Sequence, residues 1–300
     1  MSVLVVGRFA PSPTGPLHFG SLVAAVGSYC LARQAGGRWL LRMEDLDTPR
    51  VVAGAADTML RTLERLGFVW DGPVVYQSQR QDAYAAALEQ LQHDGLIFPC
   101  ACSRKEILAS APHPGEEGPV YPGTCRNGLP PGRVPRAQRL RVPAEEITFI
   151  DGIFGSCRQH LAEAVGDFVL KRADGPFAYQ LAVVVDDAAA GVNQVVRGAD
   201  LLASTARQIY LLRCLNLTPP AYWHLPLALD GAGKKISKRQ GNKPASTQRD
   251  AEMLHAVLTF LGQEPPVSMR RVPAPELLAW GVASFSVKQV SPLARRVVVL

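Results

Sequence analysis

Arg8-Phe-Ala-Pro-Ser-Pro-Thr-Gly-Pro-Leu-His-Phe-Gly-Ser21 connects an apolar, β-branched run at residues 3–6 to an alanine-rich segment that begins at Leu22. This succession predicts a strand, a tight loop and a helix. Gly20 and Ser21 then lie at the helix N-terminus, where unpaired backbone N–H groups and the helix dipole favour a bound anion. The glycine spacing matches neither the dinucleotide fingerprint nor the P-loop, so we expect an anion site of another kind.

The composition is that of a folded globular protein. The chain has 300 residues, of which 47% are hydrophobic, and a net charge of +6. Length suggests about two domains, and the charge is compatible with a polyanionic partner or with an ordinary basic enzyme. The first residues do not resemble a signal peptide, and no apolar run approaches the ~18 residues of a membrane span. We therefore expect a cytoplasmic protein without a membrane partner, in which six cysteines do not form a disulfide framework.

Short apolar runs alternate with amphipathic segments along the first half of the chain. Helical patterns at residues 21–35, 52–66 and 81–94 surround a strand-like run at residues 38–43. This alternation predicts an α/β fold with a parallel sheet. The apolar run at residues 181–185 is interpreted as a buried strand, and Asp186-Asp187 after it as a turn or a helix cap.

Three cysteines gather in a segment rich in proline and glycine. Cys100, Cys102 and Cys125 lie in a region with little apolar periodicity, which favours a structural zinc site over free thiols. The residues alone leave the fourth ligand open between His113, Tyr121 and a residue from elsewhere in the chain.

Charged loops follow two of the strand-like runs. Glu44, Asp45 and Asp47 come directly after residues 38–43, where open α/β sheets bind ligands, although a solvated turn has the same composition. Lysine and arginine are concentrated between glycines at residues 230–243. Such a loop suits either a clamp on transferring phosphates or a basic surface contact.

Four segments of the chain together resemble class I aminoacyl-tRNA synthetases of the glutamate branch. Residues 11–21 are similar to that branch's version of the HIGH signature, and Lys235-Ile-Ser-Lys-Arg239 to its KMSKS signature. Residues 42–47 and 196–200 match two further blocks between them. The resemblance implies a Rossmann-type parallel sheet with a zinc-containing insertion and a small helical C-terminal region. It divides the chain into two halves of a catalytic domain (1–98 and 173–215), an insertion (99–172), and the signature loop with a stem-contact region (216–300).

The resemblance also implies a reaction. Glutamate and ATP, with Mg²⁺, would form glutamyl-adenylate and pyrophosphate. The stretch after the signature loop is much shorter than the anticodon-binding region of full-length members. This length resembles the short members of the branch, which transfer glutamate to queuosine in the anticodon of tRNA(Asp). The alternatives are a minimal synthetase that charges the 3′ end of tRNA(Glu), and a non-catalytic paralogue that binds amino acid or RNA.

Matching to the family assigns expected roles to individual residues. The residues implied for glutamate are Arg8, Ala10, Ser12, Glu44, Tyr179 and Arg197. Those implied for ATP are His18, Gly20, Ser21, Lys235, Ser237 and Lys238, with His18 and Lys238 as the catalytic pair. A Cys-x-Cys…Tyr-x-x-x-Cys pattern implies Cys100, Cys102, Tyr121 and Cys125 as ligands of the zinc. Arginine suits a carboxylate because its planar guanidinium presents two parallel N–H donors.

Overall fold

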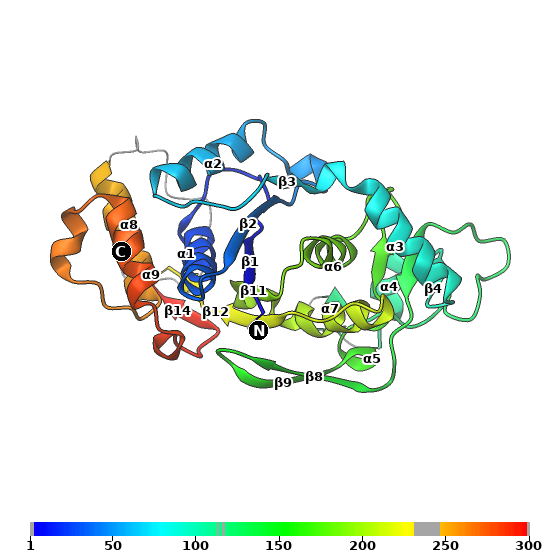
Figure 1. Ribbon diagram of the computed structural model, residues 1–300. Helices are drawn as coiled ribbons and strands as arrows, with labels where there is room; N and C mark the ends of the chain where they lie inside the picture. Colours follow the sequence, from blue (N-terminus) through cyan, green and yellow to red (C-terminus); the bar gives the residue numbers. More distant parts are fainter. Residues whose placement is uncertain (1–2, 113, 116–117, 231–246, 299–300) are drawn as a thin grey trace.

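A parallel-rich sheet forms the centre of the structure (Figure 1). The computed structural model describes residues 3–112, 114–115, 118–230 and 247–298, and in this part of the chain the sheet has seven strands, in the order β3-β2-β1-β11-β12-β8-β9. They are β1 (Val6–Phe9), β2 (Arg38–Met43), β3 (Val75–Tyr76), β8 (Glu146–Asp151), β9 (Gly155–His160), β11 (Gln194–Gly198) and β12 (Ala221–Leu225). Neighbours run parallel from β3 to β8, and β9 is antiparallel to β8. The expected α/β fold is confirmed.

Helices cover both faces of this sheet. The longer ones are α1 (Phe19–Gln34), α2 (Ala55–Arg65), α3 (Gln81–His93), α6 (Tyr179–Ala189), α7 (Leu202–Cys214), α8 (Thr247–Phe260) and α9 (Ala274–Ser284). One core contains α1 with α2, α8 and α9, and a second contains α3, α6 and α7. Successive side chains of a strand point to opposite faces, so Phe9 joins the α1 core while Arg8 faces α6.

The prediction for residues 181–185 was wrong, because they belong to helix α6 rather than to a strand. Val183 to Val185 are β-branched, which favours strands. Most of this helix is buried, however, including both aspartates near its C-terminal end. A helix that is apolar on nearly every side shows no amphipathic period, so the pattern could not distinguish it from a buried strand.

The middle of the chain forms a smaller unit with its own antiparallel sheet. Its strands are β4 (Ile97–Cys100), β7 (Ala137–Leu140) and β10 (Val169–Lys171), in the order β10-β7-β4. The other elements here are α4 (Arg104–Ser110), α5 (Leu161–Ala164), β5 (Pro114–Gly115) and β6 (Gly118–Pro119). The β8–β9 hairpin comes from the same stretch, yet it extends the main sheet beside β12.

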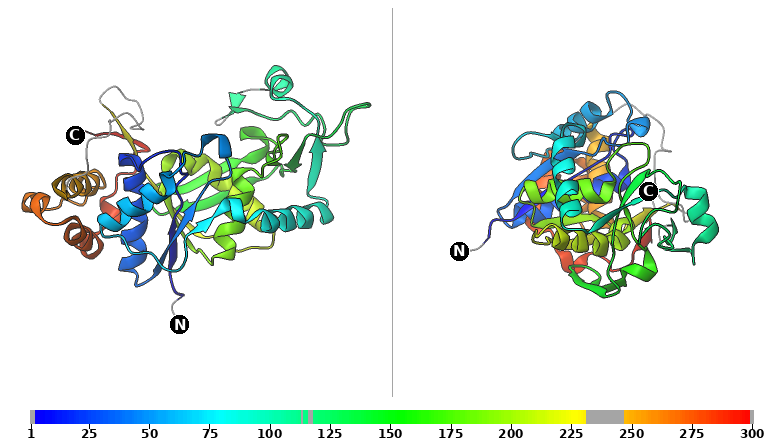
Figure 2. Two further views of the ribbon diagram at one scale, coloured as in Figure 1. Left: turned by 90° about the horizontal axis from the view of Figure 1, so that it is seen from above. Right: turned by 90° about the vertical axis from the view of Figure 1, so that its right-hand side faces the viewer.

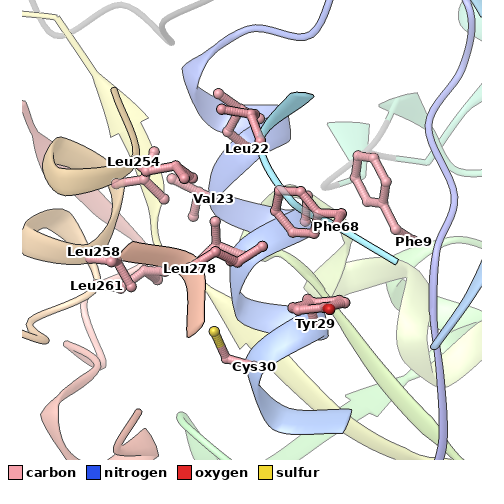
Figure 3. Packing of buried hydrophobic residues seen from close by; sticks show 14 of the residues in the cluster. Phe9, Leu22, Val23, Tyr29, Cys30, Phe68, Leu254, Leu258, Leu261 and Leu278 are labelled. Atoms are coloured by element: carbon pink, nitrogen blue, oxygen red, sulfur yellow. The ribbon is translucent and has the colours of Figure 1, made fainter. Parts of the chain in front are cut away.

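The C-terminal helices and the middle unit lie at opposite ends of the molecule (Figure 2). Leucines of α8 and α9 point toward α1 and complete its core (Figure 3). Near the end of the chain, β14 (Arg295–Val297) pairs in parallel with β13 (Leu227–Leu229). The 3₁₀ helices are η1 (Thr48–Arg50), η2 (Gln77–Gln79), η3 (Ala199–Leu201), η4 (Val267–Arg271) and η5 (Val287–Gln289). Among the described helices, none combines the length and the apolar character needed to cross a membrane.

Candidate active site

The loop between β1 and α1 ends in a histidine cap. Helix α1 begins at Phe19, and His18 precedes it with extended backbone angles. Its Nδ1 accepts a hydrogen bond from the backbone N–H of Ser21 at 3.3 Å. A neutral imidazole whose Nδ1 accepts carries its proton on Nε2. The helix N-terminus expected at Gly20 and Ser21 is confirmed, with a ring N–H donor beside it.

Two backbone hydrogen bonds hold this loop against the segment that follows β2. The N–H of Glu44 donates to Pro11 O, and the N–H of Val52 donates to Pro13 O, both at 2.9 Å. The segments that follow the carboxyl ends of β1 and β2 are therefore joined to each other. Ligands of parallel α/β sheets bind at these strand ends.

A cavity of about 360 Å³ opens beside this loop. Every described residue that the sequence assigned to glutamate or ATP lines it: Arg8, Ala10, Ser12, His18, Gly20, Ser21, Glu44, Tyr179 and Arg197. The sequence assignment missed other lining residues, among them Thr14, Arg50, Asp200, Leu227 and Ala228. Lys235, Ser237 and Lys238 lie outside the described residues. Segments far apart in the chain thus meet at one hollow.

Buried charges support one wall of the cavity. Nη1 of Arg42 donates to Asp187 at 2.6 Å, and its Nη2 donates to Glu44 at 3.2 Å. Nε of Arg8 donates to the same Asp187 carboxylate at 3.3 Å, while its Nη1 donates to the carbonyl of Val196. Arg8 and Arg42 are each only 4% exposed. Two cations on adjacent strands therefore share one carboxylate of α6.

Burial and the two arginines have opposite effects on the pKa values of Asp187 and Glu44. Burial raises the pKa of Asp187, but Arg42 and Arg8 outweigh it, and the net pKa lies below the ordinary value. For Glu44, burial prevails over the same two cations and raises the pKa. Asp187 is thus a fixed anion, whereas Glu44, whose side chain is 12% exposed, is the more easily protonated group facing the cavity.

The neighbouring Asp186 lies 3.8 Å from Nε of the same Arg42 and has further partners in the segment from η2 to the first turn of α3. It accepts hydrogen bonds from Arg80 Nε at 2.7 Å, from Gln77 at 2.9 Å and from the Tyr84 hydroxyl at 2.7 Å. The interpretation of Asp186-Asp187 as a turn or a cap was wrong, since both side chains are buried in ion pairs. No local signal could identify them, because their partners lie more than a hundred residues away.

Arg197 projects from the end of β11 and is held at all three nitrogens. Its Nε donates to His224 Nε2 at 3.0 Å, its Nη1 to Gln208 at 2.7 Å, and its Nη2 to Thr205 at 2.8 Å and to the carbonyl of Leu201 at 3.2 Å. The guanidinium is therefore oriented before any ligand binds. His224, Gln208 and Thr205 were all missed by sequence reasoning, because single polar residues within apolar runs are typical of ordinary cores.

The predicted cysteine cluster forms at the end of β4. The sulfur atoms of Cys100, Cys102 and Cys125 lie within 4.8 Å of one another and could hold a metal ion. The Tyr121 hydroxyl lies 3.5 Å from Cys100 Sγ and 3.9 Å from Cys102 Sγ. It also accepts the backbone N–H of Cys125 at 2.8 Å. His113, another of the alternatives for the fourth ligand, lies outside the described residues.

The sequence matches the family described as class I tRNA synthetases (E and Q), catalytic domain, over residues 4–262. It is 62% identical over 275 residues to the glutamyl-Q tRNA(Asp) synthetase of Dechloromonas aromatica, covering 91% of each chain. It is 56% identical to the protein of that name from Geobacter sulfurreducens, over 94% of this chain and 92% of the relative. The glutamate-tRNA synthetase structure from Elizabethkingia anophelis superposes with a TM-score of 0.80 at 27% identity, over 98% of this chain and 68% of that one.

We expect Asp187→Asn to lower the free energy of unfolding by about 3–5 kcal/mol, because Arg8 and Arg42 would lose the buried anion that they share. Denaturant titration at neutral pH measures this loss. Asp174→Asn is the matched control. It removes an exposed pairing with Arg172 at 2.7 Å and should change stability little. Equal effects of the two substitutions would contradict the role given to Asp187.

Proposed function

The chain belongs to the class I tRNA synthetases of the glutamate and glutamine group, and on that premise we propose that it activates glutamate with ATP and transfers the glutamyl group to queuosine in the anticodon of tRNA(Asp). The observation that carries this proposal is the cavity at the strand ends, which Arg8, Arg197, Glu44 and the start of α1 line together. The acceptor is inferred from the names of relatives that match nearly the whole chain.

The charges of the cavity complement those of glutamate. The amino acid carries one ammonium and two carboxylates, so it needs one anionic group and cationic donors around it. Glu44 supplies the anion, and Arg8 and Arg197 supply the cations. Tyr179 lies on the same wall, and burial raises the pKa of its hydroxyl, which keeps it a neutral donor. Ala10 and Ser12 bring loop backbone to the substrate.

Activation requires positioning and charge stabilisation rather than a protein nucleophile. A carboxylate oxygen of glutamate attacks the α-phosphorus of ATP, and the bond to the departing pyrophosphate breaks. His18 and the start of α1 at Gly20 and Ser21 would face the phosphates, where His18 Nε2–H and the backbone N–H of Gly20 stabilise developing charge, since the Ser21 N–H already donates to His18 Nδ1. By resemblance, Lys235, Ser237 and Lys238 act on the same phosphates, and Mg²⁺ accompanies ATP.

Transfer then moves the glutamyl group to the tRNA. A hydroxyl of the queuosine cyclopentenediol attacks the activated carbonyl carbon, loses its proton, and AMP leaves. Charging the 3′ end of tRNA(Glu) is the second candidate, favoured by the superposition on a glutamate-tRNA synthetase. The higher identity to proteins named glutamyl-Q tRNA(Asp) synthetase supports queuosine as the acceptor.

Zn²⁺ suits the donors of the cysteine cluster. Tetrahedral zinc with Zn–S bonds of ~2.3 Å places sulfur atoms about 3.8 Å apart, and Cys102 Sγ lies 3.7 Å from Cys125 Sγ. Burial is outweighed at Cys100 by hydrogen bonding with Tyr121 and Arg139, which lowers its pKa and favours its thiolate, whereas burial raises the pKa values of Cys102 and Tyr121. Cys100, Cys102, Tyr121 and Cys125 would hold one structural ion, joining β4 to the loop around Tyr121.

The acceptor is tested by incubating the protein with labelled glutamate, ATP and one of three tRNAs: queuosine-containing tRNA(Asp), tRNA(Asp) lacking queuosine, and tRNA(Glu). After nuclease digestion, mass spectrometry should detect glutamyl-queuosine in the first sample alone. Label on the 3′ adenosine of tRNA(Glu), with none on queuosine, would replace this function by the second candidate. Absence of glutamate-dependent ATP–pyrophosphate exchange, with or without tRNA, would favour the non-catalytic alternative.

Binding of the glutamate ammonium needs ionised Glu44, and burial raises the pKa of this carboxyl. On acidification, kcat/KM for glutamate should therefore begin to fall at a pH above the ordinary pKa of a glutamate side chain, ~4.3, because kcat/KM reports ionisations of the free enzyme. Glu44→Gln should lower kcat/KM about tenfold or more at neutral pH and remove this pH dependence. An unchanged pH profile in the variant would contradict the assignment of Glu44 to the ammonium.

Elemental analysis of protein purified without chelators should find about one zinc per chain. Cys125→Ser should lower this content and the thermal stability, because a structural metal contributes directly to folding. Cys30→Ser is the control, since Cys30 is buried in the α1 core away from the cluster, and it should retain the metal. If the purified protein contains no zinc and Cys125→Ser leaves its thermal stability unchanged, the proposal of a structural zinc ion is wrong.

A further inference from the structure

A buried chain of polar groups runs behind Arg197 across three neighbouring strands. Asp151 ends β8, His224 lies on β12, and Arg197 lies opposite His224 in the β11–β12 register. Asp151 Oδ2 lies 2.6 Å from His224 Nδ1, and Arg197 Nε lies 3.0 Å from His224 Nε2. The side chains of Asp151 and His224 are both 0% exposed. Groups this deeply buried keep their contacts only if donors and acceptors match.

The contacts determine the tautomer of His224. Arginine has no acceptor, so the Nε2 that meets Arg197 Nε–H must be unprotonated, and the ring proton lies on Nδ1. That proton is donated to Asp151 Oδ2. The other oxygen, Oδ1, accepts the backbone N–H groups of Ile153 and Phe154, both at 2.9 Å. Burial lowers the pKa of His224 and outweighs the opposing effect of Asp151, so the ring is neutral.

We propose that Asp151 and His224 are positioning residues that orient Arg197 toward its carboxylate ligand, with Asp151 acting through the tautomer of the histidine. This proposal rests on the assignment of Arg197 to glutamate under the proposed function. A proton on Nε2 would face the Nε–H of Arg197, and two donors at 3.0 Å repel each other. The guanidinium would then turn about its remaining contacts to Gln208 and Thr205.

This arrangement links the substrate pocket to the β8–β9 hairpin. Asp151 is the last residue of β8, and its backbone-bound oxygen caps the turn that leads into β9. Arg197 lines the cavity at the other end of the chain of contacts. Thr205 Oγ1 also lies 3.2 Å from His224 Nε2, so it completes the polar surroundings of that atom. Asp151 and His224 would thus influence how the cavity binds a carboxylate, although neither residue lines the cavity.

Asp151→Asn changes the tautomer with almost no change in size. The backbone N–H groups of Ile153 and Phe154 need an acceptor, so the amide oxygen takes the Oδ1 position and the NH₂ group faces His224 Nδ1. Nδ1 must then accept, and the ring proton moves to Nε2. We expect KM for glutamate to rise about tenfold or more in ATP–pyrophosphate exchange, with KM for ATP within about twofold of the unaltered protein.

His224→Gln should preserve the orientation of Arg197. The amide oxygen of glutamine can accept the hydrogen bond from Arg197 Nε, and it has no second tautomer that would replace this acceptor by a donor. The KM of this variant for glutamate should stay within about threefold of that of the unaltered protein, and adding Asp151→Asn to it should raise KM no further. His224→Leu, which has no acceptor, should match or exceed the effect of Asp151→Asn. Asp174→Asn, exposed and outside the cavity lining, is the control that should leave both KM values unchanged.

The ¹⁵N spectrum of histidine-labelled protein reports the tautomer directly, with the His224 signal assigned by its loss in His224→Gln. The unaltered protein should show protonated Nδ1, and Asp151→Asn should show protonated Nε2. A protonated Nε2 in the unaltered protein, or equal rises of both KM values in Asp151→Asn, would overturn the positioning role. If the unaltered protein shows no glutamate-dependent exchange, the proposed function fails and the substrate part of this proposal fails with it.

Discussion

The carboxylate of Asp187 is the interaction on which the site depends. Arg8 and Arg42 stand on adjacent parallel strands, 4% exposed each, and Asp187 of α6 lies within hydrogen-bond distance of both. Two buried guanidinium groups on adjacent strands would destabilise the fold without an anion that pairs with both. Helix α6 is thereby fixed against the sheet, and the same contact sets the wall of the cavity that Arg8 and Glu44 share.

Another part of the cavity lining depends on elements from the C-terminal part of the sequence. β13 carries Leu227 and Ala228 into the cavity lining, and β14 pairs with it along its length. Arg296 of β14 donates to the carbonyl of Phe260, whose ring packs on Phe19 at the start of α1. The C-terminal helices therefore pack against α1, and Figure 3 shows Leu254, Leu258 and Leu278 directed toward it.

The sequence pattern correctly predicted elements whose structure depends on residues close together in the chain. Residues 38–43 form β2 with the expected bounds, and His18 to Ser21 lie at the start of α1. The prediction of a strand at residues 181–185 was wrong because a helix buried on nearly every side lacks the polar face that identifies a helix in a sequence. Asp187 lies 179 residues from Arg8, and the side-chain partners of His224 are 19, 27 and 73 residues away, so no local signal could reveal these contacts. The roles of Lys235, Ser237 and Lys238 remain predictions.

The proposed function requires the strand-end cavity to hold glutamyl-adenylate. A crystal structure of the protein with a non-hydrolysable analogue of this intermediate would locate that binding site. We expect the ammonium beside Glu44, a carboxylate on Arg8 and Arg197, and the phosphate near His18 and the N-terminus of α1. An analogue bound elsewhere, or one placed in this cavity with its carboxylate away from both arginines, would contradict it.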